Sequence, residues 1–220
     1  MKLFAPAENR QPSWQINLGS LGIAAAQFAR CGFDVSIQYG ADKPAHDMVV
    51  TKGSSLLKVV VKGSEEGFWN LTQSYVQRAA RMSGKNAAFH GAIEMWLDHH
   101  GARTVCCLVQ FQNVPVEQLP RIYLATPSEV AQRLRETADG RGDSILYEGN
   151  EWASGLGGTT ATEGLPASWR FSLARIQELM TNQAQAANLL SLPSNAEPSR
   201  IWPSSVRFPP GDGSNLAKRA

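Results

Sequence analysis

Two apolar runs rich in β-branched residues, 48–51 (MVVT) and 56–61 (LLKVVV), limit what this chain can fold into. The residues between them read KGSS, which predicts a tight turn and antiparallel pairing of the two strands. Residues 33–40 (FDVSIQYG) alternate apolar and polar side chains, as a half-buried strand does. We therefore expect a three-stranded meander over residues 33–64.

Helical patterns surround this meander. A helix is expected over 17–31, with Asn17 as a cap, and another over 74–100, broken near Ser83-Gly84. Thr126 and Glu129 form a capping-box pattern at the start of a third helix, and a fourth is expected to begin near Ser172. Further strands are expected at 104–113, 120–126 and 144–148. This order predicts an α/β or α+β domain, with a mixed central sheet flanked by helices.

The 220 residues are enough for one domain with appended segments. We expect an N-terminal arm at 1–16, a core domain at 17–190 and a tail at 191–220. The tail is rich in Pro, Ser and Gly, a composition that does not form a core of its own.

Charge and cysteine content restrict the partners and the compartment. The net charge of +2 comes from 21 basic and 19 acidic residues, which argues against a strongly basic nucleic-acid-coating protein and permits a local basic groove. No transmembrane segment or secretion signal is expected. The 3 cysteines lack metal-binding spacing and indicate reduced thiols in a cytoplasm. Cys106 and Cys107 are expected to be core residues of a strand.

Two charged residues border the apolar runs. Asp47 opens the first run and Lys62 closes the second. In an antiparallel hairpin the start of one strand lies beside the end of the next, so the two side chains are expected to meet at one edge of the sheet. Val60 and Lys62 are two residues apart and point to the same face.

These motifs resemble a known family. A helix followed by GFDVS, HDMVV and LLKVVVKGS, within residues 17–65, is similar to the PD-(D/E)XK nuclease superfamily, in its Holliday-junction resolvase-like and restriction-endonuclease-like branches. The stretch VQFQNVPVEQLPRIYLATPSEVAQRL resembles the downstream half of uncharacterised bacterial proteins built on this core. The resemblance implies a restriction-endonuclease-like sheet.

The resemblance also implies roles for individual residues. In the superfamily an Asp, and an acid or amide two residues before the lysine, hold Mg²⁺ or Mn²⁺, while the lysine positions the attacking water. Asp47 matches the metal ligand and Lys62 matches the lysine. In the alternative interpretation Asp47 caps a turn after KPAH and Lys62 is an ordinary charge at the end of a strand. The backbone carbonyl of Val61 is a further candidate metal ligand.

The chain departs from the family pattern at two positions. Val60 stands where the second ligand is expected, and Ile23 follows Gly22 where the family's helix often carries a Glu. Valine cannot bind a metal, so the expected activity is weakened or absent. Other acids are candidates to replace the lost ligands: Asp34, Asp42, Glu65, Glu66, Glu94 and Asp98.

Four residues are candidates for nucleic-acid contact. Trp69 could stack on a base, or it could plug the edge of the sheet. Arg78, Arg81 and Lys85 could contact phosphates, or they could form a solvated helix face.

The first functional hypothesis is a protein that binds or cleaves DNA, in DNA processing or defence, by metal-assisted hydrolysis if it is active. The alternative is a non-catalytic interaction protein on the same scaffold, with a protein partner. Resolvase-like domains are often dimers, so a homodimer is also expected.

Overall fold

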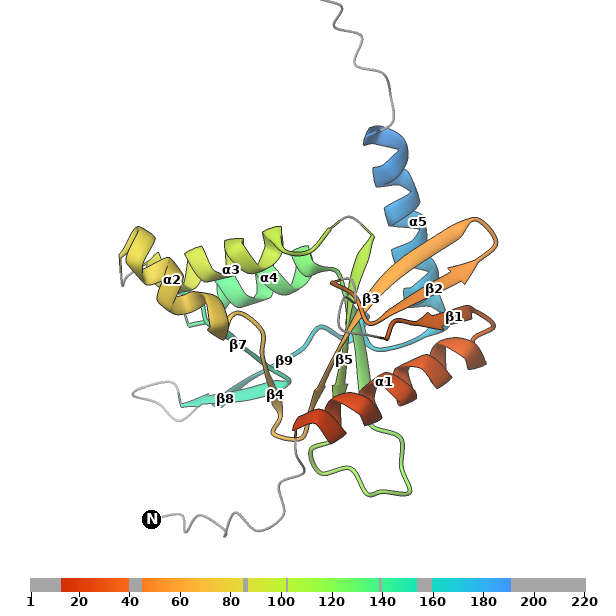
Figure 1. Cartoon of the computed structure of the whole chain (residues 1–220). Helices are drawn as coiled ribbons and strands as arrows, with labels where there is room; N and C mark the ends of the chain where they lie inside the picture. Colours follow the sequence, from red (N-terminus) through yellow and green to blue (C-terminus); the bar gives the residue numbers. More distant parts are fainter. Residues whose placement is uncertain are drawn as a thin grey trace, which may run out of the picture.

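The computed structural model describes residues 13–39, 45–84, 87–101, 103–138, 140–153 and 160–190. Five α-helices and nine strands occur in these ranges (Figure 1). In chain order they are α1 (Ser13–Arg30), β1 (Asp34–Ile37), β2 (Met48–Lys52), β3 (Ser55–Ser64), β4 (Phe68–Asn70), α2 (Gln73–Ser83), α3 (Ala88–Asp98), β5 (Thr104–Gln110), β6 (Arg121–Ala125), α4 (Pro127–Glu136), β7 (Ile145–Tyr147), β8 (Gly149–Ala153), β9 (Thr160–Gly164) and α5 (Leu173–Leu190).

A five-stranded mixed sheet, ordered β1-β2-β3-β5-β6, forms the centre of the fold. Strands β1, β2 and β3 are antiparallel neighbours, β3 and β5 are parallel, and β6 is antiparallel to β5. A parallel pair needs a long crossover connection, which α2 and α3 supply. The prediction of an α/β domain with a mixed sheet flanked by helices is confirmed.

The sheet separates two hydrophobic clusters. On one face α1 and α5 pack against β2, β3 and β5, and the buried members include Phe28, Val59, Val61, Cys107 and Ile176. On the other face α3 and α4 cover β5 and β6, and the members include Trp96, Cys106, Leu108 and Leu134. Figure 1 shows these helix pairs on opposite sides of the sheet. The second cluster contains no residue of β1, β2 or β3. On this part of the second face Lys58 and Lys62 are exposed and Val60 is buried; we call it the open half-face.

Helix α1 approaches β3 closely because residue 63 is glycine. A Cβ at Gly63 would lie 2.9 Å from Cγ2 and 3.0 Å from the carbonyl oxygen of Ile16, and would overlap Oγ of Ser20. Ser20 is fully buried and donates a hydrogen bond of 2.6 Å to the Ile16 carbonyl. The absence of a side chain at Gly63 therefore sets the distance between helix and sheet.

Several predicted elements need correction. Helix α1 begins at Ser13 and not at Asn17, so the predicted arm at 1–16 includes the first helical turn. Three strands are not among the expected ones: β4, which pairs with β7, and β8 and β9, which pair with each other. The break at Gly84 and the capping box of Thr126 and Glu129 are confirmed. The predicted tail at 191–220 lies outside the described residues.

None of the helices in the described ranges combines the length and the apolar character that crossing a bilayer requires.

Candidate functional site at the β2–β3 edge

Asp47 is held in place by three hydrogen bonds between β1, β2 and β3. Its backbone N–H donates to the Val59 carbonyl at 2.9 Å, and its carbonyl accepts from Gln38 N–H at 2.8 Å. Its carboxylate Oδ2 accepts from the backbone N–H of Val61 at 2.8 Å. The carboxylate is therefore fixed against β3, at the place where the two strands separate.

The register of β2 and β3 decides which side chains lie beside Asp47. Met48 pairs with Val59, so continuing the register by one residue puts Val60 opposite Asp47. Lys58, Val60 and Lys62 alternate onto the open half-face, where both lysines are exposed and Val60 is only 6% exposed. Asp47 and Lys62 thus come to the same edge, with an apolar side chain between them.

The backbone of Val61, the other candidate ligand, contacts Asp47. The Val61 N–H donates to the Asp47 carboxylate, on the β2 side of β3. In a regular strand the N–H and C=O of one residue point toward the same neighbouring strand. The Val61 carbonyl therefore lies on the Asp47 side of β3, and the Val61 side chain belongs to the buried cluster under α1.

Beside Lys62 is a pocket of about 380 Å³, formed by the start of α1, the end of β3 and strand β4. Polar groups in its lining include Asn17, Glu65 and Glu66, whereas Asp47 does not line it. The candidate ligand and the candidate lysine therefore share an edge of the sheet but do not share this pocket.

Trp69 forms the inner wall of that pocket and needs correction as a nucleic-acid contact. Its side chain is 3% exposed, its indole N–H donates to the Lys62 carbonyl at 3.0 Å, and its ring packs edge-on against Tyr123 at 6.3 Å. A buried indole cannot stack on a base. Trp69 instead fastens β4 to the end of β3, which is the plug considered as the alternative.

Two histidines lie near the site. Burial and the nearby Lys58 lower the pKa of His46, although Asp47 acts in the opposite direction. Burial, His99 and Lys62 lower the pKa of His100 to about 4. The ring of His100 packs against Trp96 at 4.5 Å, and neither ring nitrogen has a hydrogen-bond partner among the described residues. His100 is therefore neutral at pH 7 and adds no charge beside Lys62.

The donor set at Asp47 does not fit a divalent metal. Mg²⁺ requires several oxygen ligands, and here one carboxylate stands opposite a valine. Within the described ranges no group of three or more His, Cys, Asp and Glu side chains is arranged to hold a metal ion.

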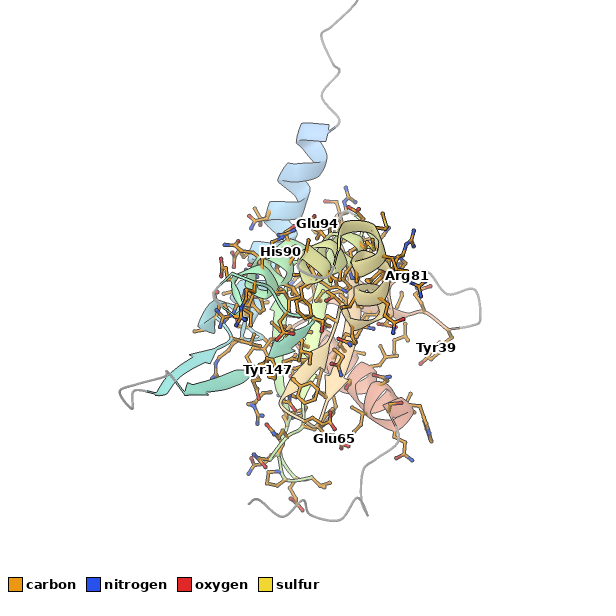
Figure 2. All side chains as sticks on the ribbon, turned by 90° about the vertical axis from the view of Figure 1, so that its left-hand side faces the viewer. Tyr39, Glu65, Arg81, His90, Glu94 and Tyr147 are labelled. Carbon is orange, nitrogen blue, oxygen red and sulfur yellow. The ribbon has the colours of Figure 1, made fainter. Side chains whose placement is uncertain are left out.

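Of the acids considered as replacements, Glu65 and Glu66 line the pocket beside Lys62, which Asp47 does not line. Figure 2 shows Glu65 at the opposite end of the molecule from Glu94 and His90. Glu94 pairs with Arg135 at 2.6 Å, and Asp42 lies outside the described residues. The chemistry open to this site is charge recognition by lysines, with a fixed carboxylate beside them.

The basic residues of α2 are exposed. Arg78 and Arg81 are exposed on a helix that packs mainly against α3, and Figure 2 shows Arg81 on its outer surface. Lys85 lies outside the described residues. Phosphate contact by these side chains stays a prediction.

The cysteines of β5 are core residues. Cys106 and Cys107 are buried, and burial raises the pKa of the Cys106 thiol to about 12 and raises that of Cys107 further. Neither thiol is available as a thiolate at neutral pH.

The structure contains two partly buried polar networks that the sequence patterns did not reveal. Arg121 binds both carboxylate oxygens of Glu148, at 2.6 and 2.7 Å, and the Tyr123 hydroxyl donates to the same group at 2.7 Å. Burial raises the pKa of Glu148, but the hydrogen bonds from Arg121 and Tyr123 outweigh it and leave that pKa lowered. This network joins β6 to the segment after β7.

The second network joins α5 to the start of α4. Arg175, 4% exposed, binds both oxygens of Glu129 at 2.6 and 2.7 Å and donates to the Leu124 carbonyl at 3.2 Å. The capping-box pattern identified Glu129 from the sequence, but nothing in the sequence indicated its partner 46 residues later.

The fold and the site define a mixed α/β domain with a carboxylate and a lysine at the edge of a β-hairpin. No family model, no curated protein and no solved structure matches the chain.

Proposed function

We propose that this protein binds DNA on its open half-face and does not hydrolyse it. The observation that carries the proposal is the position of Lys62: exposed at the end of β3, beside a carboxylate fixed by the Val61 N–H. The same edge in the PD-(D/E)XK nucleases, which the sequence resembles, faces a phosphodiester. The order of α1, the β1–β3 meander, the helical crossover and parallel β5 agrees with that resemblance.

Charge and spacing on β3 support contact with a phosphate backbone. Lys58 and Lys62 are four residues apart on one strand, which separates them by about 13 Å. This distance is about four base-pair rises along a DNA strand. Both are exposed, and the second hydrophobic cluster includes no residue of β3. Two cations on a rigid strand can hold one backbone in a defined orientation without reading sequence.

The absence of hydrolysis follows from Val60. A nuclease of this kind needs a metal to stabilise charge on the phosphate and to lower the pKa of the attacking water. With valine opposite Asp47, the site lacks the second oxygen ligand. We therefore infer that the lysines retain a binding role and that the carboxylate no longer supports catalysis.

Replacing Lys62 or Lys58 with alanine is expected to weaken DNA binding by about 3- to 10-fold each. Each change should also reduce the slope of log affinity against log salt by about 1, because one phosphate contact is lost. Fluorescence anisotropy with a short labelled duplex, over a series of salt concentrations, measures both quantities.

Lys52→Ala is the matched control. Lys52 lies at the end of β2 with its ammonium 4.9 Å from the Phe33 ring, on the face that α1 covers. Its removal should leave the affinity unchanged. Equal weakening by all three variants would mean that binding responds to net charge alone, and no binding by the unaltered protein would favour the non-catalytic scaffold.

A further inference from the structure

The pocket beside Lys62 combines apolar and polar walls. Its volume of about 380 Å³ lies within the range of pockets that bind small organic groups. Trp69 and Leu71 are its most buried apolar residues, and Ile16 and Phe68 are half-buried beside them. Because Trp69 is only 3% exposed, it contributes an edge and not a stacking face. A small, uncharged group with polar edges suits such a pocket.

The backbone of Gly63 directs a donor and an acceptor toward the pocket. The Val61 N–H points to the β2 side of β3, and the Ser64 carbonyl accepts from the Phe111 N–H on the β5 side. Backbone direction alternates along a strand, so the N–H and C=O of Gly63 point to the β2 side. The pairing of β2 with β3 ends at Val59, so Gly63 lies beyond the last pair and lines the pocket instead.

The sign of the charge changes along the chain at this pocket. Lys58 and Lys62 are followed by Glu65 and Glu66. Lys62 and the two glutamates line the pocket, and Figure 2 shows Glu65 at the lower end of the molecule, below Tyr147. Three residues span at most about 11 Å, which is close to the Debye length of about 10 Å at 0.1 M salt. A phosphate placed in the pocket beyond Lys62 would therefore be repelled by carboxylates that salt does not fully screen.

We propose that this pocket binds the unpaired terminal nucleoside of a DNA strand, while Lys62 holds the last phosphate. This inference rests on the proposed DNA binding, and it names the DNA that binds best: a strand with a hydroxyl end. A terminal nucleoside has no phosphate beyond it, so it can occupy a pocket with acidic walls. The continuous backbone of an internal segment cannot.

The polar groups of the pocket match the edge of a nucleobase. A base presents N–H donors and nitrogen or oxygen acceptors in one plane. The Gly63 backbone and the side-chain amides of Asn17 and Asn70 supply both kinds of partner. The carboxylates of Glu65 and Glu66 accept hydrogen bonds only, from an exocyclic amino group or from the terminal hydroxyl.

The same charges disfavour a phosphorylated end. A terminal phosphate monoester carries a charge of about −1.5 to −2 at pH 7. Among the described residues that line the pocket, Lys62 is the one cation, against two carboxylates. A pocket built for a terminal phosphate would have the opposite balance.

Fluorescence anisotropy with internally labelled duplexes of one length tests the inference. A duplex with short single-stranded overhangs and hydroxyl ends should bind about 5- to 10-fold more tightly than a duplex whose ends are closed by hairpin loops. Comparing 3′ with 5′ overhangs shows which end enters the pocket. Free deoxyadenosine should not compete, because it lacks the phosphates that Lys58 and Lys62 bind.

A terminal phosphate tests the role of the two acids. Adding it to the preferred overhang should weaken binding by about 3- to 10-fold. Glu65→Gln with Glu66→Gln should remove this penalty, because the amides carry no charge. Glu117→Gln with Glu136→Gln is the matched control: both glutamates are exposed and lie outside the pocket. This control changes the net charge equally and should retain the penalty.

The outcomes separate this inference from DNA binding itself. Equal affinity for open and closed duplexes, tighter binding of the phosphorylated end, or displacement by deoxyadenosine would overturn end recognition and leave the proposed DNA binding in place. A phosphate penalty that persists in Glu65→Gln with Glu66→Gln would overturn the assignment of the pocket. Failure of every duplex to bind would overturn both proposals.

Discussion

Arg175→Ala is expected to lower the free energy of unfolding by about 3 kcal/mol. Arg175 is 4% exposed and binds Glu129, Glu178 and the Leu124 carbonyl. Alanine would leave the carbonyl without this donor and would leave Glu129 beside the sheet without its cation. Glu129 and Glu178 are partly exposed, so water would recover part of the loss, and the estimate takes the lower end of the range for broken buried pairs.

Urea unfolding followed by circular dichroism measures this change, and Arg135→Ala is its matched control. Arg135 also forms an arginine–carboxylate pair, with Glu94 at 2.6 Å, but both side chains are substantially exposed. Its replacement should alter stability by less than about 1 kcal/mol. Similar losses for the two variants would show that α5 is not held on the sheet by Arg175.

Gly63→Ala is expected to lower the free energy of unfolding by about 2–3 kcal/mol. The added methyl group would overlap Oγ of Ser20 and would lie 3.0 Å from the backbone carbonyl of Ile16. The serine can turn away only by giving up its bond to that carbonyl, and the backbone of α1 cannot move without disturbing Phe28 and the cluster beneath it. Thermal or urea unfolding measures the loss.

Gly22→Ala, on helix α1 itself, is expected to raise the free energy of unfolding. Its Cβ meets nothing within 4 Å, so the change should raise stability by up to about 1 kcal/mol through helix propensity.

The double variant Gly63→Ala with Ser20→Ala should be more stable than Gly63→Ala alone, because the overlap with the serine hydroxyl is removed. The recovery should be incomplete, because the close contact with Ile16 remains. A neutral Gly63→Ala would mean that α1 does not approach β3 as closely as described.

The elements with strong local signals could be predicted from the sequence. The β-branched runs of β2 and β3 and the capping box at Thr126 depend on neighbouring residues, and each appears where it was expected. Strand β4 was missed because it has 3 residues and is a strand only through its pairing with β7, more than seventy residues later. The start of α1 was placed four residues late because Asn17 is a good cap residue, although the helix continues through it.

Some parts of the candidate site could also be predicted from local patterns, whereas others depend on contacts between distant residues. The hairpin rule brought Asp47 and Lys62 to one edge, because the turn after β2 fixes the register. Trp69 was taken as a candidate contact because a glycine-flanked aromatic residue suggests an exposed loop. Its burial depends on Tyr123 and Leu146, which come from distant strands that no local pattern reveals. The partner of Glu129 is equally non-local.

The central claim is that the open half-face binds DNA without a metal and leaves it intact. The most direct test is to incubate the protein with a short labelled duplex in EDTA and in Mn²⁺, measuring the affinity by anisotropy and the products by denaturing electrophoresis. We predict equal affinity in the two conditions, full-length DNA in both, and weaker binding by Lys62→Ala. Cleavage in Mn²⁺ that disappears in Asp47→Ala would contradict the account, because Asp47 would then hold a catalytic metal despite Val60.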